Sequence, residues 1–272
     1  MEAIKALSLG KLTLGGKSVA LVAPNGSGKT SNCIAPAILY FLTYFPRGQV
    51  PVTSSSWMQV EKQLFPALRR YMDNPFFDGW TFNKTEIRTP EGGFAVGFST
   101  DNAGRAEGWH PKISPDVDPV FYVLDEAKTI PDSIFTAVSR CTLFHAFITS
   151  SPGADSGTFY DCFHKNSSLY YKIRVKYEDC PHIEINDPGK AERLKKEYGE
   201  QSSFYRSAIL GEFTDLDGQS VISRRSLMEL VNNPPPFLDT GETCGGFDFA
   251  AGGDENVFAA GQGNRFFIAD HW

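Results

Sequence analysis

Three groups of residues have the types and spacing needed for chemistry on phosphate esters. In the first, Ala-Pro-Asn-Gly-Ser-Gly-Lys-Thr follows the apolar run Val19–Val22 and precedes a segment that is apolar at helical spacing apart from Pro36. Strand, loop and helix form the context of a phosphate-binding loop, which holds phosphate oxygens with backbone N–H groups. The predicted ATP-binding residues are Ala23, Pro24, Asn25, Gly26, Ser27, Gly28, Lys29 and Thr30.

Two side chains of this loop have predicted roles. Lys29 is expected to reach the β- and γ-phosphates, and the Thr30 hydroxyl is expected to hold Mg²⁺. The pattern G-x-x-x-x-G-K-S/T is met except at its first position, where Ala23 replaces glycine. Alanine suits that position if its φ is negative. The alternative is a glycine-rich turn that binds nothing, and the strand and helix on either side argue against it.

The second group is a pair of acids after an apolar run. Val120–Leu124 suits a strand buried on both faces, and Asp125 and Glu126 follow it directly. In P-loop enzymes the first acid orients the Mg²⁺ shell, and the second is placed to polarise the attacking water. Strand ends are often acidic, so the pair gains weight only from its place after the loop.

The third group consists of hydroxyls and an arginine. The strand predicted from Leu143 breaks into a polar turn at Thr149 and Ser150, which are candidates for sensing the γ-phosphate; the alternative is an ordinary turn. Phosphoryl transfer also needs a cation that neutralises the transition state. Arg105, in a polar loop at residues 100–110, is the first candidate, and Arg140 and Arg47 remain open.

Strand and helix patterns alternate around these groups, which predicts an α/β domain with a parallel sheet. Residues 57–72 have the pattern of an amphipathic helix that Pro66 is expected to kink. The run Asn-Asn-Pro-Pro-Pro at 232–236 opens the clearest linker in the chain. The predicted organisation is a P-loop ATPase domain at 1–231, a linker at 232–243 and a short β segment at 244–272.

Bulk properties narrow the class of protein. The 272 residues are 41% hydrophobic and 21% charged, as in a soluble globular protein, and no apolar stretch reaches the length of a membrane span. Five cysteines without a C-x-x-C pair argue against a disulfide framework. The net charge of −6 lacks the basic footprint of static nucleic-acid binders, but it leaves room for a motor that grips DNA transiently.

Taken together, the motifs resemble the large terminase subunit of tailed double-stranded DNA phages, the motor that packages viral genomes. Residues 23–30 match its Walker A loop, 120–126 match Walker B with the catalytic glutamate, and 148–153 resemble its coupling motif. Gly246-Phe247-Asp248-Phe249-Ala250, with Asp254, resembles the first strands of its RNase H-like nuclease. The resemblance implies an ASCE-type P-loop NTPase with a mainly parallel central sheet flanked by helices, followed by a truncated RNase H-like β segment.

The resemblance also implies activities and partners. They are ATP hydrolysis with Mg²⁺, translocation of double-stranded DNA, a portal protein, a small terminase subunit, a homo-oligomeric ring and the bacterial host's cytoplasm. The family's nuclease holds two divalent metals with several carboxylates. Only Asp248 matches that set well, while Asp254 and Asp270 are weaker candidates, so we expect an incomplete metal site and no DNA cleavage by this chain alone.

Two other classes stay open on the sequence. One is a P-loop helicase or another DNA-remodelling ATPase, which shares the two acids but has a second core that this sequence lacks. The other is an inactive, truncated prophage product that folds without working.

Overall fold

The computed structural model describes residues 18–98, 104–110, 119–141, 144–214, 230–234, 236, 238, 241–249 and 256–271. The chain divides into two compact units, Met1–Gln219 (unit 1) and Ser220–Trp272 (unit 2). The domain boundaries predicted after residues 231 and 243 stay a prediction, because residues 215–229 and 239–240 lie outside the described part.

Within the described residues, unit 1 contains an eight-stranded sheet in the order β3-β4-β5-β2-β6-β7-β1-β8. Every pair from β5 to β8 is parallel, and β3 and β4 form an antiparallel edge. The strands are β1 (Ser18–Val22), β2 (Gln49–Ser54), β3 (Thr81–Asn83), β4 (Glu86–Arg88), β5 (Phe94–Gly97), β6 (Val120–Asp125), β7 (Phe144–Ser150) and β8 (Tyr170–Arg174). The predicted α/β class with a mainly parallel sheet is confirmed.

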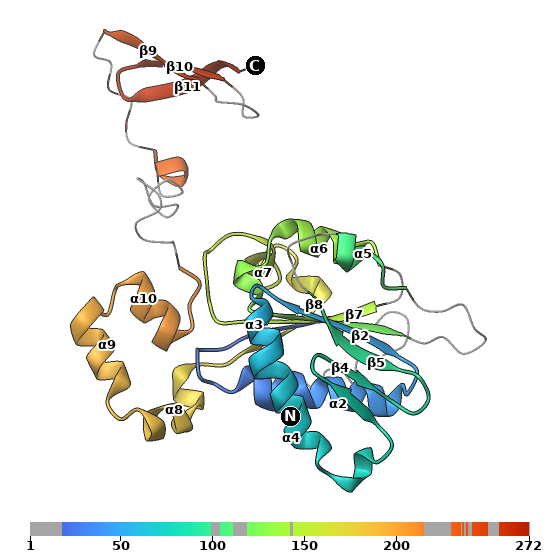
Figure 1. Ribbon diagram of the computed structural model, residues 1–272. Helices are drawn as coiled ribbons and strands as arrows, with labels where there is room; N and C mark the ends of the chain where they lie inside the picture. The colour runs from blue at the N-terminus through green and yellow to red at the C-terminus, as the bar shows by residue number, and fades with distance from the viewer. Residues whose placement is uncertain are drawn as a thin grey trace. The chain divides into compact units, whose positions relative to one another are not determined.

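Helical segments connect these strands. They are η1 (Lys29–Ile34), α2 (Ala35–Tyr44), α3 (Trp57–Gln59), η2 (Val60–Leu64), α4 (Phe65–Met72), η3 (Pro75–Phe77), α5 (Gly104–Glu107), η4 (Ala127–Thr129), α6 (Asp132–Ser139), α7 (Thr158–Asp161), η5 (Ser167–Leu169), η6 (Tyr177–Asp179), α8 (Pro181–Asn186), α9 (Lys190–Tyr198), α10 (Ser203–Tyr205) and η7 (Arg206–Leu210). Figure 1 shows α2 and α4 on one face of the sheet and α5, α6 and α7 on the other.

Alternation along the strands supplies a core on each face of the sheet. On β1, Val19 and Leu21 pack in the cluster that includes α2 and α4, and Ala20 and Val22 pack in the cluster that includes α6. All four side chains are at most 2% exposed, as expected for a parallel sheet covered on both sides. Burying one large side chain such as Phe41 contributes about 1.5–3 kcal/mol, so the two cores stabilise the packing of helices on both faces of the sheet.

Prolines mark the change of helix type in two places. Pro36 and Pro66 both lie in the first turn of an α-helix, directly after the π-helical segments η1 and η2. Proline lacks a backbone N–H and clashes with the preceding turn of a regular helix, and the wider π turn accommodates it. The kink predicted at Pro66 therefore takes the form of a π-to-α transition.

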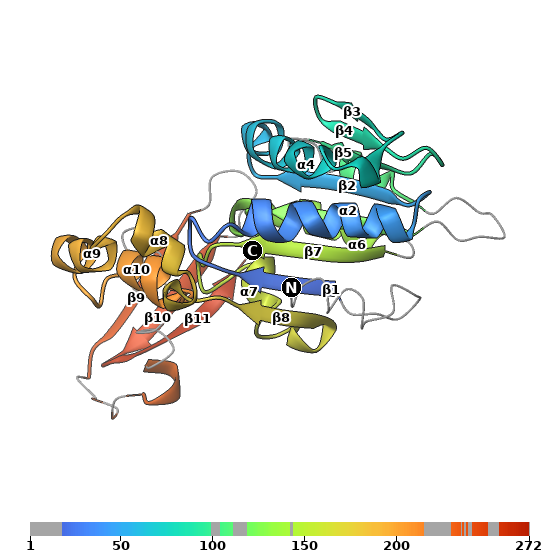
Figure 2. The same ribbon diagram turned by 90° about the horizontal axis from the view of Figure 1, so that it is seen from below.

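The parallel strands place the polar strand ends at one edge of the sheet. In Figure 2 the arrowheads of β1 and β7 point toward the side where α8, α9 and α10 lie. The loop after β1 begins at this carboxyl edge, and so do the turns after β6 and β7. Ligands bind at this edge in open α/β sheets.

Unit 2 contains a small antiparallel sheet in the order β11-β10-β9 within its described residues. Its strands are β9 (Thr243–Asp248), β10 (Val257–Gln262) and β11 (Arg265–His271). An antiparallel sheet of this kind agrees with the RNase H-like segment that the resemblance implies. Across the described parts of both units, no helix combines the length and the apolar character needed to cross a membrane.

Candidate nucleotide-binding site

The loop after β1 depends on two glycines. Gly26 and Gly28 have φ values of 82° and 81°, a region that residues with a side chain rarely adopt. A Cβ added at Gly28 would also lie 2.6 Å from the side-chain nitrogen of Asn32. Among the described non-glycine residues only Glu126 has a positive φ, so Ala23 does not. The first motif position therefore needs no glycine in this chain.

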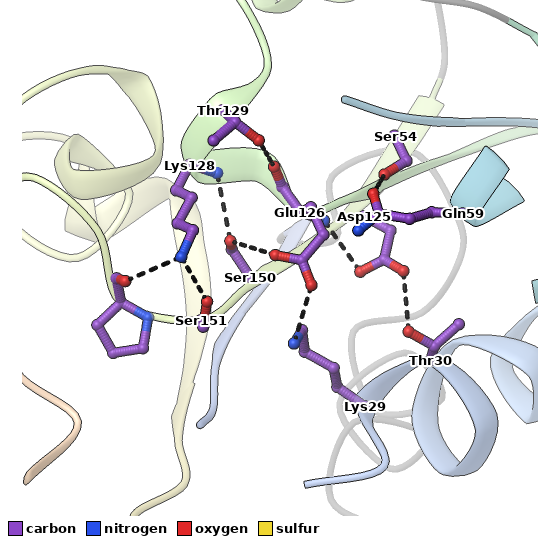
Figure 3. Close-up of polar contacts among 11 residues, drawn as sticks. Lys29, Thr30, Ser54, Gln59, Asp125, Glu126, Lys128, Thr129, Ser150 and Ser151 are labelled. Carbon is purple, nitrogen blue, oxygen red and sulfur yellow. Dashed lines mark hydrogen bonds and ion pairs between the residues drawn. The ribbon is translucent and has the colours of Figure 1, made fainter. Parts of the chain in front are cut away.

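Figure 3 shows that the loop meets the acid pair. The Lys29 Nζ lies 3.0 Å from Glu126 Oε1, and Thr30 Oγ1 donates a hydrogen bond to Asp125 Oδ2 at 2.9 Å. The second pair joins residues 95 positions apart in the sequence. Lys29 is 7% exposed and Glu126 18% exposed. The structure thus gathers the four residues that we predicted to share one triphosphate.

Sheet topology explains why they meet. On neighbouring strands, Leu21 of β1 is in register with Thr149 of β7, and Thr149 is in register with Asp125 of β6. The three strands are parallel, so their carboxyl ends share one edge, and each polar residue follows the last apolar residue of its strand. Thr30 and Asp125 are far apart in the sequence but close in space, because β1 and β6 both lie beside β7 in the sheet.

Glu126 has a strained backbone, with φ 51° and ψ 44° in the left-handed region. A non-glycine residue pays a steric cost there and keeps that conformation only where the surroundings impose it. The Glu126 carbonyl accepts hydrogen bonds from the Thr129 amide at 3.1 Å and the Thr129 hydroxyl at 3.0 Å, which holds the turn. The turn directs the Glu126 carboxylate toward Lys29 (Figure 3).

Burial raises the pKa of the Asp125 carboxyl to about 6, and the charge of Glu126 adds to the rise. Lys29, the Thr30 hydroxyl and the Glu126 amide oppose it. A buried carboxylate beside a second acid is stabilised by a nearby cation. The site therefore favours a positive ion close to Asp125.

The oxygen atoms of Thr30 and Asp125 fit Mg²⁺. Hydroxyl and carboxylate oxygens are the kind of ligand this ion takes, and adjacent octahedral ligands at about 2.1 Å from the ion lie about 3 Å apart. Thr30 Oγ1 and Asp125 Oδ2 are 2.9 Å apart. These two residues would hold the ion that accompanies a nucleotide.

The predicted coupling residues lie next to the acids. Ser150 Oγ donates to Glu126 Oε2 at 3.3 Å and accepts the Lys128 amide at 3.3 Å. The Thr149 hydroxyl is buried, and among the described residues its oxygen has no hydrogen-bond partner. Ser150 is in direct contact with the candidate base. Their role in coupling stays a prediction.

A pocket of about 520 Å³ opens beside this cluster. One wall comes from the loop and Glu126, as the sequence predicts, and the second wall comes from η2 and α4, which sequence reasoning missed. Nothing in the local pattern of residues 57–72 tells which element that helix faces. The lining residues are Asn25, Gly26, Gly28, Lys29, Thr30, Ser31, Lys62, Gln63, Pro66, Arg70 and Glu126.

A second contact that the sequence did not indicate comes from α8. The Nε2 atom of His182 lies 3.0 Å from the Gly26 carbonyl oxygen, so the protonated nitrogen donates to the loop. The helix at 181–186 was not predicted, because its run is short and begins with Pro181. The segment after β8 therefore touches the loop from outside the sheet.

None of the three candidate arginines has a side chain that the structure describes at the nucleotide site. The backbone of Arg105 belongs to α5, but its side chain lies outside the described residues. Arg47 precedes β2 and Arg140 precedes β7, which places both at the amino edge of the sheet, opposite the loop. Arg140 is also paired with Glu107 at 2.5 Å. Which of the three arginines neutralises the transition state, and whether it comes from this chain or from a neighbouring copy, stays a prediction.

In unit 2, Asp248 ends β9 in register with Val257, and Asp270 on β11 is in register with Phe258. Asp254 lies outside the described residues. Within the described part of the chain, no group of three or more His, Cys, Asp or Glu side chains is arranged to hold a metal. The nuclease role of Asp248 and its incomplete site stay predictions.

No family model and no curated protein matches this sequence. Solved structures do match. The large terminase of a thermophilic bacteriophage aligns over 100% of this chain and 67% of its own, with 12% identity and a TM-score of 0.58. The same terminase in complex with ATP-γ-S aligns over 99% of this chain and 67% of its own, with 13% identity and a TM-score of 0.56.

The large terminase ATPase domain of Thermus phage P74-26 aligns over 78% of this chain and 96% of its own, with 16% identity and a TM-score of 0.54. Identities this low establish a shared fold and no more. The resemblance inferred from the motifs is confirmed at that level: this chain has the fold of the large terminases of tailed phages.

Proposed function

We propose that this chain is the ATP-hydrolysing motor of viral DNA packaging, a terminase large subunit that translocates double-stranded DNA into a procapsid. The observation that carries the proposal is the meeting of Lys29 and Thr30 with Glu126 and Asp125 at 3.0 and 2.9 Å. It occurs on a fold whose solved examples include a large terminase in complex with ATP-γ-S.

In the proposed mechanism Lys29 exchanges its partner. Lys29 pairs with Glu126 in the structure. Its ammonium would turn to the phosphate oxygens of a bound triphosphate, and the Glu126 carboxylate would be released. Glu126 then accepts a proton from the water that attacks the γ-phosphorus. The bond from that phosphorus to the β–γ bridging oxygen breaks, and the electron pair leaves with ADP. Mg²⁺ bound through Thr30 and Asp125 would supply charge neutralisation at the phosphates.

In this proposal Ser150 transmits the position of the Glu126 carboxylate to the turn that follows β7. Its hydroxyl bonds Glu126 in the present structure, so a shift of the carboxylate toward water must change that contact. Double-stranded DNA, a portal protein, a small terminase subunit and assembly into a ring are the partners that a packaging motor implies. ATP with Mg²⁺ is the fuel.

Steady-state ATP hydrolysis by the full chain tests the proposal, with and without double-stranded DNA. Lys29→Ala should abolish nucleotide binding, because it removes the cation at the phosphates. Glu126→Gln should bind ATP but turn it over at least about 100-fold more slowly, since a missing general base costs about 10²–10⁴-fold. The exposed residues Lys172 and Glu192 offer matched controls, Lys172→Ala and Glu192→Gln, which should match the parent.

Equal turnover by the parent and by Glu126→Gln would refute the assigned base. Strand separation driven by ATP would instead identify a helicase, and a chain that binds no ATP would be an inactive remnant.

A further inference from the structure

The helix opposite the phosphate loop presents one polar face to the pocket. Lys62, Gln63, Pro66 and Arg70 all line it. Pro66 follows Lys62 by four residues and Gln63 by three, and Arg70 follows Pro66 by four, which are the spacings of residues on one side of a helix. The other side carries Leu64, Phe65 and Leu68, each at most 1% exposed. Burial of that apolar side fixes the polar face toward the loop.

The cations around the pocket differ in their partners. Lys29 is paired with Glu126, and Lys62 with Glu61 at 3.2 Å. The Arg69 guanidinium stacks over the Phe82 ring at 5.2 Å from its centroid. Among the described residues the Arg70 guanidinium has no hydrogen bond, ion pair or ring partner, although it lines the pocket.

The charge of the pocket points to the class of ligand. Its lining contains three cationic side chains, Lys29, Lys62 and Arg70, and a single acid, Glu126. A guanidinium offers a planar set of donors that matches phosphate oxygens. We propose that Arg70 binds the polyphosphate of the nucleotide from within the same chain, an inference that rests on the proposed ATPase function.

A structural role is the competing explanation. Arg69 and Arg70 both lie in the last turn of α4, where basic side chains stabilise the helix dipole. Arg69 shares that position and charge but faces Phe82. Arg69→Ala is therefore the control for removing a basic side chain from this turn of α4 without removing a side chain that lines the pocket.

The experiment measures the affinity of the full chain for ATP, ADP and AMP by calorimetry. Arg70→Ala should weaken ATP and ADP binding by about tenfold or more, because hydrogen bonds to charged groups are lost, and should leave AMP binding nearly unchanged. Arg70→Lys should fall between the two, since it keeps the charge but loses the planar donors. Arg69→Ala should bind all three as the parent does.

Equal ATP affinity of the Arg70→Ala and Arg69→Ala variants would overturn the inference. An equal loss for ATP and AMP would do so as well, because it indicates a damaged pocket rather than a lost phosphate contact. If Arg70→Ala fails to fold, as circular dichroism would show, Arg70→Gln replaces it. If the parent binds ATP and Arg70→Ala binds it equally well, only this inference is refuted. If the parent binds no ATP, the proposed function is refuted too.

Discussion

At the scale of single residues, the hydrogen bond between Thr30 and Asp125 joins the two side chains that are expected to hold Mg²⁺. The carboxylate is 5% exposed and lies beside Glu126, so its pKa is raised, and the Thr30 hydroxyl partly offsets that. The hydroxyl has two uses, one toward the acid and one toward the metal that the pair would hold. Valine has the shape of threonine but no hydroxyl, so Thr30→Val removes both contacts of the hydroxyl and keeps the packing of the side chain.

We predict that Thr30→Val lowers ATP turnover by about 10- to 100-fold, because a charged, buried hydrogen bond is lost together with a metal ligand. Thr30→Ser, which keeps the hydroxyl, should stay within a few-fold of the parent. Turnover measured over a range of Mg²⁺ concentrations checks this, and the valine variant should need more Mg²⁺ for half-maximal rate. Identical Mg²⁺ dependence in both variants would contradict the assigned ligand.

At the scale of elements, the turn after β6 is tied to the turn after β7. Lys128 Nζ donates to Ser151 Oγ at 2.7 Å and to the Pro152 carbonyl at 3.5 Å (Figure 3). The same carbonyl accepts the Ser207 hydroxyl of η7 at 3.0 Å. A hydrogen-bonded path therefore joins the acid pair to the helices after β8. Burial lowers the pKa of Lys128, and the charge of Glu126 opposes that fall.

Lys128→Met keeps the side-chain length and removes the donor. We expect a loss of about 1–3 kcal/mol in the free energy of unfolding, because the Ser151 hydroxyl and the Pro152 carbonyl lose a charged partner. Urea denaturation measures the change. Lys172→Met on the exposed edge of β8 is the control and should shift stability by less than about 0.5 kcal/mol. Equal shifts in both variants would show that the path contributes nothing to stability.

At the scale of the whole molecule, the pocket belongs to one unit. Among the residues that the structure describes, all that line the pocket lie between Asn25 and Glu126, inside unit 1. Both faces of that unit's sheet have their own core. Nucleotide binding should therefore be independent of unit 2.

A chain ending at Gln219 tests this division. It should bind ATP with an affinity within about twofold of the full chain, since distant sites act independently. Calorimetry checks the value, and Lys29→Ala in the shortened chain confirms that the same loop is used. A folded but non-binding short chain would show that unit 2 contributes to the site.

The sequence alone was enough to locate the phosphate loop and the acid pair, which are both short runs of residues. The loop at 23–30 and the acids at 125 and 126 each follow an apolar strand directly. Strand periodicity and loop chemistry are local properties. The polar loop predicted around Arg105 instead contains the short helix α5, which packs with α6 through the buried residue Ala106.

Only the tertiary structure decided which elements face the loop. The side of the helix at 62–70 that lines the pocket, the contact of His182 with Gly26, and the remote edge where Arg47 and Arg140 lie all depend on packing between distant segments. No local pattern encodes such pairings, because they follow from the order of strands and the direction in which each helix returns across the sheet.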